Sequence, residues 1–456
     1  MRTALANLER RAIAAVEPLP ACVPATAPVA SAGASRRSAY LALAAILAPL
    51  CVPAGPAQSA ALDVVNVVAL AAFGLALLAP GRRLRAPLVL PVALVAIGSL
   101  VATLSAPSAG LAALALAQDA YLFAWFLLIV NLVREPADVR LVRVAWTWTA
   151  VAVSLGAVGQ LLVQTHGSLG TLLGARGFRP ASTLYNPNML ADYLVSSVFV
   201  AASLAHEMPR GRLALAIGVL LVGLLATKSN GGAIALAAGA VVWAVVAAVT
   251  SGVSVRRVAA VTALLAGVLG LAVWFNAEWG VGDSALASLG RHTFVGRMEH
   301  SSASRLHIWE QLERSYARSP LGIGPGNSGA LTLSIAERER PNSYRSKEAH
   351  SDYLAYAIER GPLGVAGLLL MTILAFLHVG RYWNHARRAP EERRSRRGAA
   401  MWTAAMAGAL TASTVHSTVI EKLHFRHFWL LLGLVCGSAL MAAGRRDRPA
   451  PAEAPR

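Results

Sequence analysis

The sequence predicts an all-α polytopic membrane protein with about 12 transmembrane helices and a large outer loop that contains short helices. Of its 456 residues, 56% are hydrophobic and only 14% are charged, against about 25% charged residues in ordinary soluble domains. The mean hydropathy is +0.55. These values exclude a soluble enzyme and a disordered chain.

Twelve apolar segments account for the predicted helices, most of them close to the length that crosses a bilayer. In chain order they cover 38–54, 60–80, 86–106, 112–133, 144–165, 188–206, 213–227, 232–250, 258–275, 352–379, 400–416 and 428–444. The short segments 213–227 and 232–250 are joined by TKSNGG. Its lysine and glycines predict a tight turn at a membrane face.

The distribution of positive charge predicts the orientation. Seventeen arginines lie in the short loops on the side of the N-terminus, against five basic residues in the short loops on the other side. The positive-inside rule therefore places both termini in the cytoplasm. Residues 1–37 form the predicted N-terminal tail and residues 445–456 the predicted C-terminal tail. Within the N-terminal tail, ALANLERRAIAAVE is either a flexible segment or a short surface helix. No apolar run follows the first arginines, so we expect no cleaved signal peptide.

A charged outer loop, residues 276–351, separates nine predicted spans in 38–275 from three in 352–444. Within it, SRLHIWEQLERSYARS is predicted to be an amphipathic helix with Leu306, Trp309, Leu312 and Tyr316 on its apolar face. SPLGIGPGNSGA is predicted to be a turn region. A loop of this length usually forms a lid or a site.

The chain lacks the sequence motifs of several kinds of transporter and metal site. There is no P-loop, which argues against ATP-driven transport, and there is no HExxH or DxD metal pattern. Cys22, Cys51 and Cys436 are too widely spaced for a metal or disulfide motif. His424 and His427 lie three residues apart without a third ligand. We therefore expect no metal and no cofactor. The net charge of +18 is explained by membrane orientation, so no nucleic-acid partner is expected.

Two outer motifs suit an anion. Arg176 and Arg179 precede the sequence Asn186-Pro187-Asn188, a helix-start signal. Two arginines beside a helix N-terminus favour a phosphate, although they also suit lipid headgroups. In TKSNGG, Lys228 and the glycine amides at the start of the next helix form a second candidate anion site. The alternative there is a plain hairpin turn.

Two further motifs lie in and after the large loop. Arg305 precedes Trp309 by one turn on the predicted apolar face, where an arginine needs a partner or a ligand. His350 stands where the loop enters the next span, in KEAHSDYLAYAIERGPLG. A histidine there suits a general base, because its ordinary pKa is about 6.5. The alternative is an interfacial histidine that caps a helix.

These four motifs, in this order, resemble the O-antigen ligase family, whose superfamily also includes O-antigen polymerases and bacterial protein oligosaccharyltransferases. The most specific stretch is AHSDYLAYAIERGPLG, supported by RLHIW, SPLGIGPGN and NPNMLA. The chain departs from the family at Ser229-Asn230-Gly231, where members often have Ser-Arg-Gly. The role of that arginine is therefore absent or taken by Lys228 or another basic residue.

The resemblance implies an inverting, metal-independent glycosyltransferase of the bacterial inner membrane, with its active site facing the periplasm. During lipopolysaccharide biosynthesis it would transfer a glycan from undecaprenyl pyrophosphate to the lipid A–core oligosaccharide, among membrane lipids. The implied catalytic residues are His350 and Arg305. The implied ligands of the donor pyrophosphate are Arg176, Arg179, Lys228 and Arg305, with support from Asn186, Asn188, Trp309, Ser351, Asp352 and Glu359.

Three alternatives stay open. An O-antigen polymerase or a protein oligosaccharyltransferase would use the same donor with a different acceptor. A transporter or flippase would make no bond. Two features argue against transport. The polar motifs gather at one face instead of the midplane, and the buried acids Asp63, Asp119 and Asp192 are few and, by the predicted spans, lie nearer the outer side.

Overall fold

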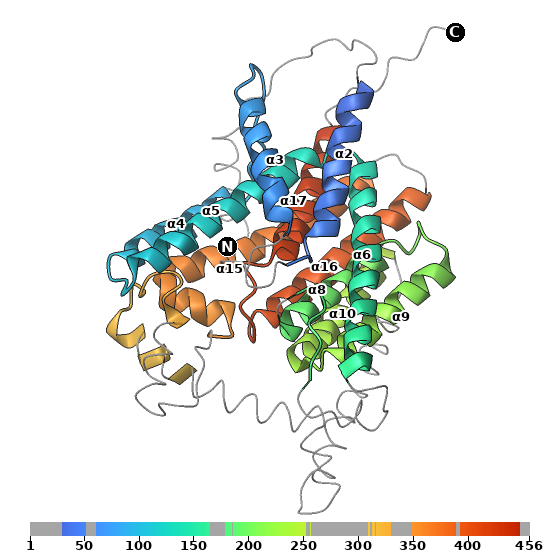
Figure 1. Cartoon of the computed structure of the whole chain (residues 1–456). Helices are drawn as coiled ribbons and strands as arrows, with labels where there is room; N and C mark the ends of the chain where they lie inside the picture. Colours follow the sequence, from blue (N-terminus) through green and yellow to red (C-terminus); the bar gives the residue numbers. More distant parts are fainter. Residues whose placement is uncertain are drawn as a thin grey trace, which may run out of the picture. The chain divides into compact units, whose positions relative to one another are not determined.

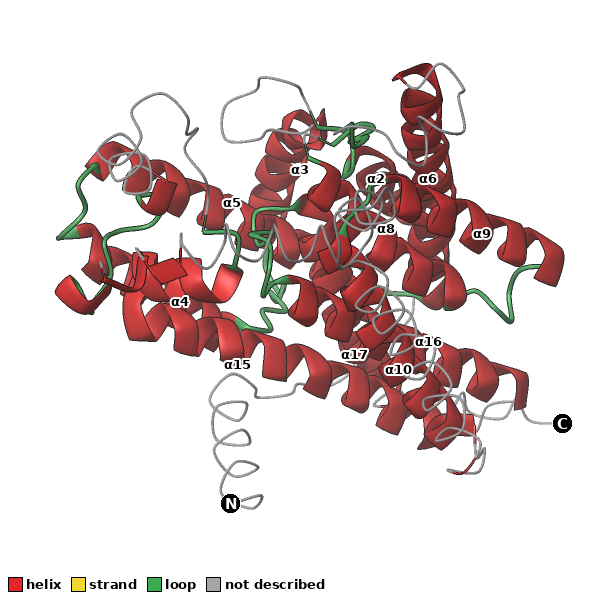
Figure 2. Ribbon diagram, turned by 90° about the horizontal axis from the view of Figure 1, so that it is seen from below, coloured by secondary structure: helices red, strands yellow, loops and turns green. Residues whose placement is uncertain are grey.

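The computed structural model describes residues 30–51, 61–164, 178–184, 186–251, 256, 309–310, 312–314, 316–329, 349–388 and 393–446. Within these ranges the chain is helical and forms no strand (Figure 2). The chain divides into two units, Met1–Ala39 and Tyr40–Arg456. Of the first unit, only the start of one helix is described.

The helices follow the predicted spans, and Figure 1 labels them along the chain. They are α2 (Ala30–Leu47), α3 (Ala61–Leu77), α4 (Val89–Thr103), α5 (Ala109–Leu132), α6 (Pro136–Gln164), α8 (Pro187–Ala202), α9 (Arg210–Ala226), α10 (Asn230–Ser251), α15 (Asp352–Arg388), α16 (Arg393–His416) and α17 (Arg426–Arg446). Every predicted span overlaps one of these helices except 258–275, which lies outside the described residues, as does the N-terminal segment ALANLERRAIAAVE.

Five of the described helices are long and apolar enough to cross a membrane, namely α5, α6, α10, α15 and α17. The apolar helices α3 and α4 are shorter. The all-helical class is therefore confirmed and the chain is a membrane protein, whereas twelve spans, the orientation and the large outer loop stay predictions.

Helix α8 is surrounded by other helices of the second unit. It packs against α6, α9, α10 and α16, and every residue from Met189 to Ala201 is buried. A helix that is apolar on all sides is expected to be surrounded by protein. Its single acid, Asp192, is buried with it and needs partners from its neighbours.

Helix α15 packs against α4, α16 and α17 and is broken near its start. Gly361 adopts φ 65° and ψ −164°, and Pro362 follows. Proline has no N–H to donate to the carbonyl of Ile358, four residues earlier. The amides of Ile323 and Gly324 donate instead to the carbonyls of Ile358 and Glu359, at 2.8 and 3.0 Å. The predicted turn region thus docks on the break.

The loop helix predicted before this turn is confirmed where it is described. Trp309, Leu312 and Tyr316 lie in a second, smaller apolar cluster with Ile323 and Ile358. The indole N–H of Trp309 donates to the carbonyl of Ala349 at 2.9 Å. The chain that precedes His350 is therefore packed on this cluster. Leu306 and Arg305 lie outside the described residues.

Candidate functional site

The first predicted motif starts α8 as expected. Asn186 has extended backbone angles and its side-chain oxygen accepts the amide N–H of Asn188 at 2.8 Å, with Pro187 as the first helical residue. This is the geometry of an N-cap. The predicted helix start is therefore confirmed.

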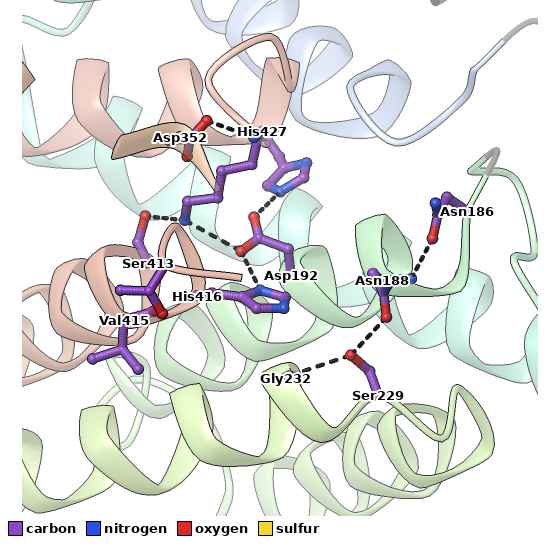
Figure 3. Close-up of polar contacts among 12 residues, drawn as sticks. Asn186, Asn188, Asp192, Ser229, Gly232, Asp352, Ser413, Val415, His416 and His427 are labelled. Atoms are coloured by element: carbon purple, nitrogen blue, oxygen red, sulfur yellow. Dashed lines mark hydrogen bonds and ion pairs between the residues drawn. The ribbon is translucent and has the colours of Figure 1, made fainter. Parts of the chain in front are cut away.

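The first and second motifs meet at Asn188 (Figure 3). Its side-chain oxygen accepts from the Arg179 guanidinium at 2.6 Å and from the Ser229 hydroxyl at 3.0 Å. Arg179 also donates from Nε to the carbonyl of Thr227 at 2.8 Å. These contacts place Arg179 beside the TKSNGG turn, close to the position where the family often has its arginine.

The TKSNGG turn separates α9 from α10, as predicted. Lys228 adopts a left-handed φ of 51°, and the Ser229 hydroxyl accepts the amide N–H of Gly232 at 3.3 Å in the first turn of α10. Gly231 has no room for a side chain, because a Cβ there would lie 2.7 Å from Val419 and 3.2 Å from the His416 ring. The segment between α16 and α17 thus covers this turn.

His350 lies two residues before the start of α15 and is half-buried. Its backbone is left-handed, with φ 53°, and its N–H donates to the Glu421 carboxylate at 3.0 Å. Ser351 is buried, and its hydroxyl accepts from the amide of Leu354 at 3.4 Å. The backbone of the fourth motif is therefore held by a segment that is distant in sequence.

Asp352 strengthens this connection. Its carboxylate accepts the amide N–H groups of Lys422 and Leu423, at 2.9 and 3.3 Å. Its own N–H donates to the carbonyl of Ser417 at 2.9 Å. Both ends of the segment 417–423 are thereby joined to the residue two positions after His350.

A buried polar cluster lies behind these contacts (Figure 3). The Asp192 carboxylate accepts from Lys422 Nζ at 3.2 Å, His416 Nδ1 at 2.8 Å and His427 Nε2 at 2.8 Å. The Lys422 ammonium also donates to the Ser413 hydroxyl. The side chains of Lys422 and Asp192 are 1% and 3% exposed. This Asp192 cluster (Asp192, Ser413, His416, Lys422 and His427) connects α8, α16 and α17.

Glu359 lies in the scaffold of the broken helix. Its carboxylate accepts from the amides of Gly326 and Ser328, at 2.9 and 3.2 Å, and from the Ser328 hydroxyl at 2.6 Å. Backbone amides of this kind often bind anions. Here they bind the carboxylate of Glu359, so this turn connects two parts of the chain and is not a candidate phosphate site.

Sequence reasoning did not assign a role to the Asp192 cluster or to Glu421. Lys422 and Arg426 are two of the five basic residues in the outer loops that were used only to predict the orientation. His427 was considered only as a weak metal candidate. An acid within an apolar span requires a partner, and this rule predicts a partner for each of Asp63, Asp119 and Asp192. Asp63 pairs with Arg426 at 2.7 Å, Asp119 with Arg360 at 2.5 Å, and Asp192 with Lys422.

Backbone strain occurs in three of the four motifs. Among the described residues, Leu88, Ser182, Lys228 and His350 are the non-glycine residues with positive φ. Ser182 belongs to the first motif, Lys228 to the second and His350 to the fourth. Strained backbone of this kind concentrates at functional sites, where the surrounding structure maintains it. Arg176 and Arg305 lie outside the described residues, so their placement stays a prediction.

The described residues contain no cluster of three or more His, Cys, Asp or Glu side chains suited to a metal ion. The site instead combines cationic groups, amide groups and one histidine next to a helix start. Such groups can bind and stabilise the charges of a phosphate, and the histidine can accept a proton.

Residues 215–369 match the family model described as O-Antigen ligase. The match includes TKSNGG, the docked turn and the His350 motif, whereas the Asn186–Asn188 helix start precedes it. No curated protein matches the chain. The predicted resemblance is confirmed over these residues, and the match supports a glycosyltransferase-like membrane enzyme of the O-antigen ligase and polymerase superfamily.

Proposed function

We propose that this protein is an O-antigen ligase of the bacterial inner membrane, acting on the periplasmic face. It would transfer a glycan from undecaprenyl pyrophosphate to the lipid A–core oligosaccharide. The observation that carries the proposal is the linkage of the His350 motif, through Asp352 and Lys422, to Asp192 of α8. The same helix starts at the junction that holds Arg179, so a base and cationic groups belong to one connected end of the bundle.

The proposed reaction is a direct displacement at the anomeric carbon of the donor glycan. The acceptor hydroxyl attacks while His350 takes its proton. The bond between the anomeric carbon and the pyrophosphate oxygen breaks, and the product has inverted configuration. The undecaprenyl pyrophosphate leaves with its negative charge, which Arg176, Arg179, Lys228 and Arg305 would stabilise. In this proposal Arg305 acts on the leaving group, because arginine matches phosphate oxygens with a planar fork.

A transporter is less well supported than an enzyme. Three of the acids within the predicted spans, Asp63, Asp119 and Asp192, each accept a hydrogen bond from a cationic side chain. Paired charges of this kind favour a fixed scaffold. A polymerase and a protein oligosaccharyltransferase share the donor chemistry, and only the acceptor separates them from a ligase.

The purified protein is expected to attach the glycan to lipid A–core in excess EDTA and without nucleotide. The measurement is a gel shift or mass spectrum of the acceptor after incubation with undecaprenyl-pyrophosphate glycan, with the His350→Ala protein as control. Longer lipid-linked chains instead would indicate a polymerase, and glycan on added pilin an oligosaccharyltransferase. Absence of any bond formation would refute the enzyme, and restoration by Mg²⁺ would refute the metal-independent mechanism.

Replacing Lys228 by glycine is expected to weaken donor binding without unfolding the turn. Glycine adopts the left-handed backbone freely, which removes about 1 kcal/mol of strain, but the positive charge is lost. We expect KM for the donor to rise about tenfold or more, with an equal or higher melting temperature. Lys228→Arg, which keeps the charge, is the control. An unchanged KM in the glycine variant would remove Lys228 from the donor site.

A further inference from the structure

The segment between α16 and α17, residues 417–425, together with the first two residues of α17, connects four parts of the structure although no motif marked it. Glu421 accepts from the backbone of His350, and the backbone of Lys422 donates to Asp352. The Lys422 and His427 side chains donate to Asp192, and Arg426 donates to Asp63. Binding and catalytic residues are found disproportionately on loops that a rigid scaffold positions.

The contact between Glu421 and His350 involves a strained residue. A left-handed backbone costs a non-glycine residue about 1–2 kcal/mol, so the conformation of His350 requires external support. The Glu421 carboxylate accepts the His350 N–H at 3.0 Å. A charged acceptor forms a stronger hydrogen bond than a neutral one. This bond fixes the point from which the imidazole side chain leaves the backbone.

Lys422 anchors Glu421 from the neighbouring position. Its backbone N–H is fixed by Asp352, and its ammonium is fixed by Asp192 and Ser413 inside the bundle. The ring of Phe428 lies 5.3 Å from the same ammonium. With Lys422 held at both its backbone and its side-chain end, the preceding carboxylate has little freedom to move away from His350.

We propose that Glu421 is a positioning residue for His350 and that Lys422 is its buried anchor. This inference rests on the proposed function, because it assumes that His350 accepts the proton of the acceptor. Glu421 acts through the backbone of His350 and takes no part in bond making. Misplacement of a reacting group by about 1 Å can cost about a hundredfold in rate.

If Glu421 acts only as a hydrogen-bond acceptor, its glutamine and alanine variants should differ in activity. Glutamine keeps a side-chain carbonyl that can accept the His350 N–H, whereas alanine removes the acceptor. We therefore expect Glu421→Ala to lower kcat about a hundredfold with little change in KM for the donor. Glu421→Gln should retain most of the turnover. A residue that used its charge or its proton in the reaction would lose activity in both variants.

The test measures kcat and KM of the purified full-length variants, together with hydrogen–deuterium exchange of the peptide that contains His350. Faster exchange is expected in Glu421→Ala and near-normal exchange in Glu421→Gln. The matched control is Glu207→Ala, which removes a carboxylate that pairs with Arg143 at 2.7 Å and Arg140 at 3.1 Å. This control is expected to lower the melting temperature without changing turnover per folded molecule.

The outcomes separate this inference from the proposed function. Wild-type kcat and unchanged exchange in Glu421→Ala would overturn the positioning role while the transferase stands. Equal inactivity of the glutamine and alanine variants, with exchange preserved in both, would also overturn it. If the wild-type protein transfers no glycan to any acceptor, the proposed function fails, and the exchange measurement alone decides whether Glu421 holds the His350 backbone.

Discussion

Replacing His350 with alanine is expected to lower glycan transfer by about 10²–10⁴-fold, the usual effect of losing a general base. The fold should survive, because Glu421 binds the backbone N–H of His350, which alanine retains. The measurement is turnover at matched amounts of folded, membrane-inserted protein.

A second variant separates loss of the base from strain. Asparagine tolerates the left-handed backbone better than most residues and carries no group that titrates near neutral pH. His350→Asn is therefore expected to be as inactive as His350→Ala while matching the wild-type melting temperature. Near-normal transfer by either variant would remove His350 from the mechanism.

Replacing Asp192 with alanine is expected to cause the largest loss of stability, about 3–5 kcal/mol, because it leaves the Lys422 ammonium buried without its counter-charge. The two histidines that donate to Asp192 would lose their acceptor as well. The measurement is the melting temperature of the purified protein in detergent, and a large decrease is expected.

The matched comparison uses the partner. A double variant, Asp192→Leu with Lys422→Met, removes both charges and replaces them with apolar groups. Since replacing a whole buried pair is often neutral, the double variant should be more stable than Asp192→Ala. Glu207→Ala should destabilise less than Asp192→Ala, because the Glu207 carboxylate is 27% exposed. A melting temperature of Asp192→Ala equal to that of the wild type would contradict the assignment of Asp192 as the counter-charge of the buried Lys422 ammonium.

Most of the helices could be predicted from apolar runs, since length and hydropathy are local properties of the sequence. The turn at TKSNGG and the helix start at Asn186 were predictable for the same reason: glycine, asparagine and proline act on the backbone around them. The break at Gly361 was harder to predict. Its stability comes from Ile323 and Gly324, which lie in a separate turn region.

The candidate site was predictable only in part. Motifs pointed to Lys228, Arg179 and His350, but the Asp192 cluster depends on contacts between residues about 230 positions apart. Hydropathy alone cannot choose which cation pairs with which acid. The rule that a buried acid needs a partner would have identified Asp192 as important, without naming Lys422.

The three acid–cation pairs have a consequence for the order in which the protein is synthesised and assembled. In each pair the acid is made first: Asp63 precedes Arg426 by 363 residues, Asp119 precedes Arg360 by 241, and Asp192 precedes Lys422 by 230. The N-terminal half is therefore synthesised with carboxylates whose partners do not yet exist. Synthesis of α15, of the segment after α16 and of α17 supplies them, so the Asp192 cluster and the other two pairs can form only after nearly the whole chain has been made.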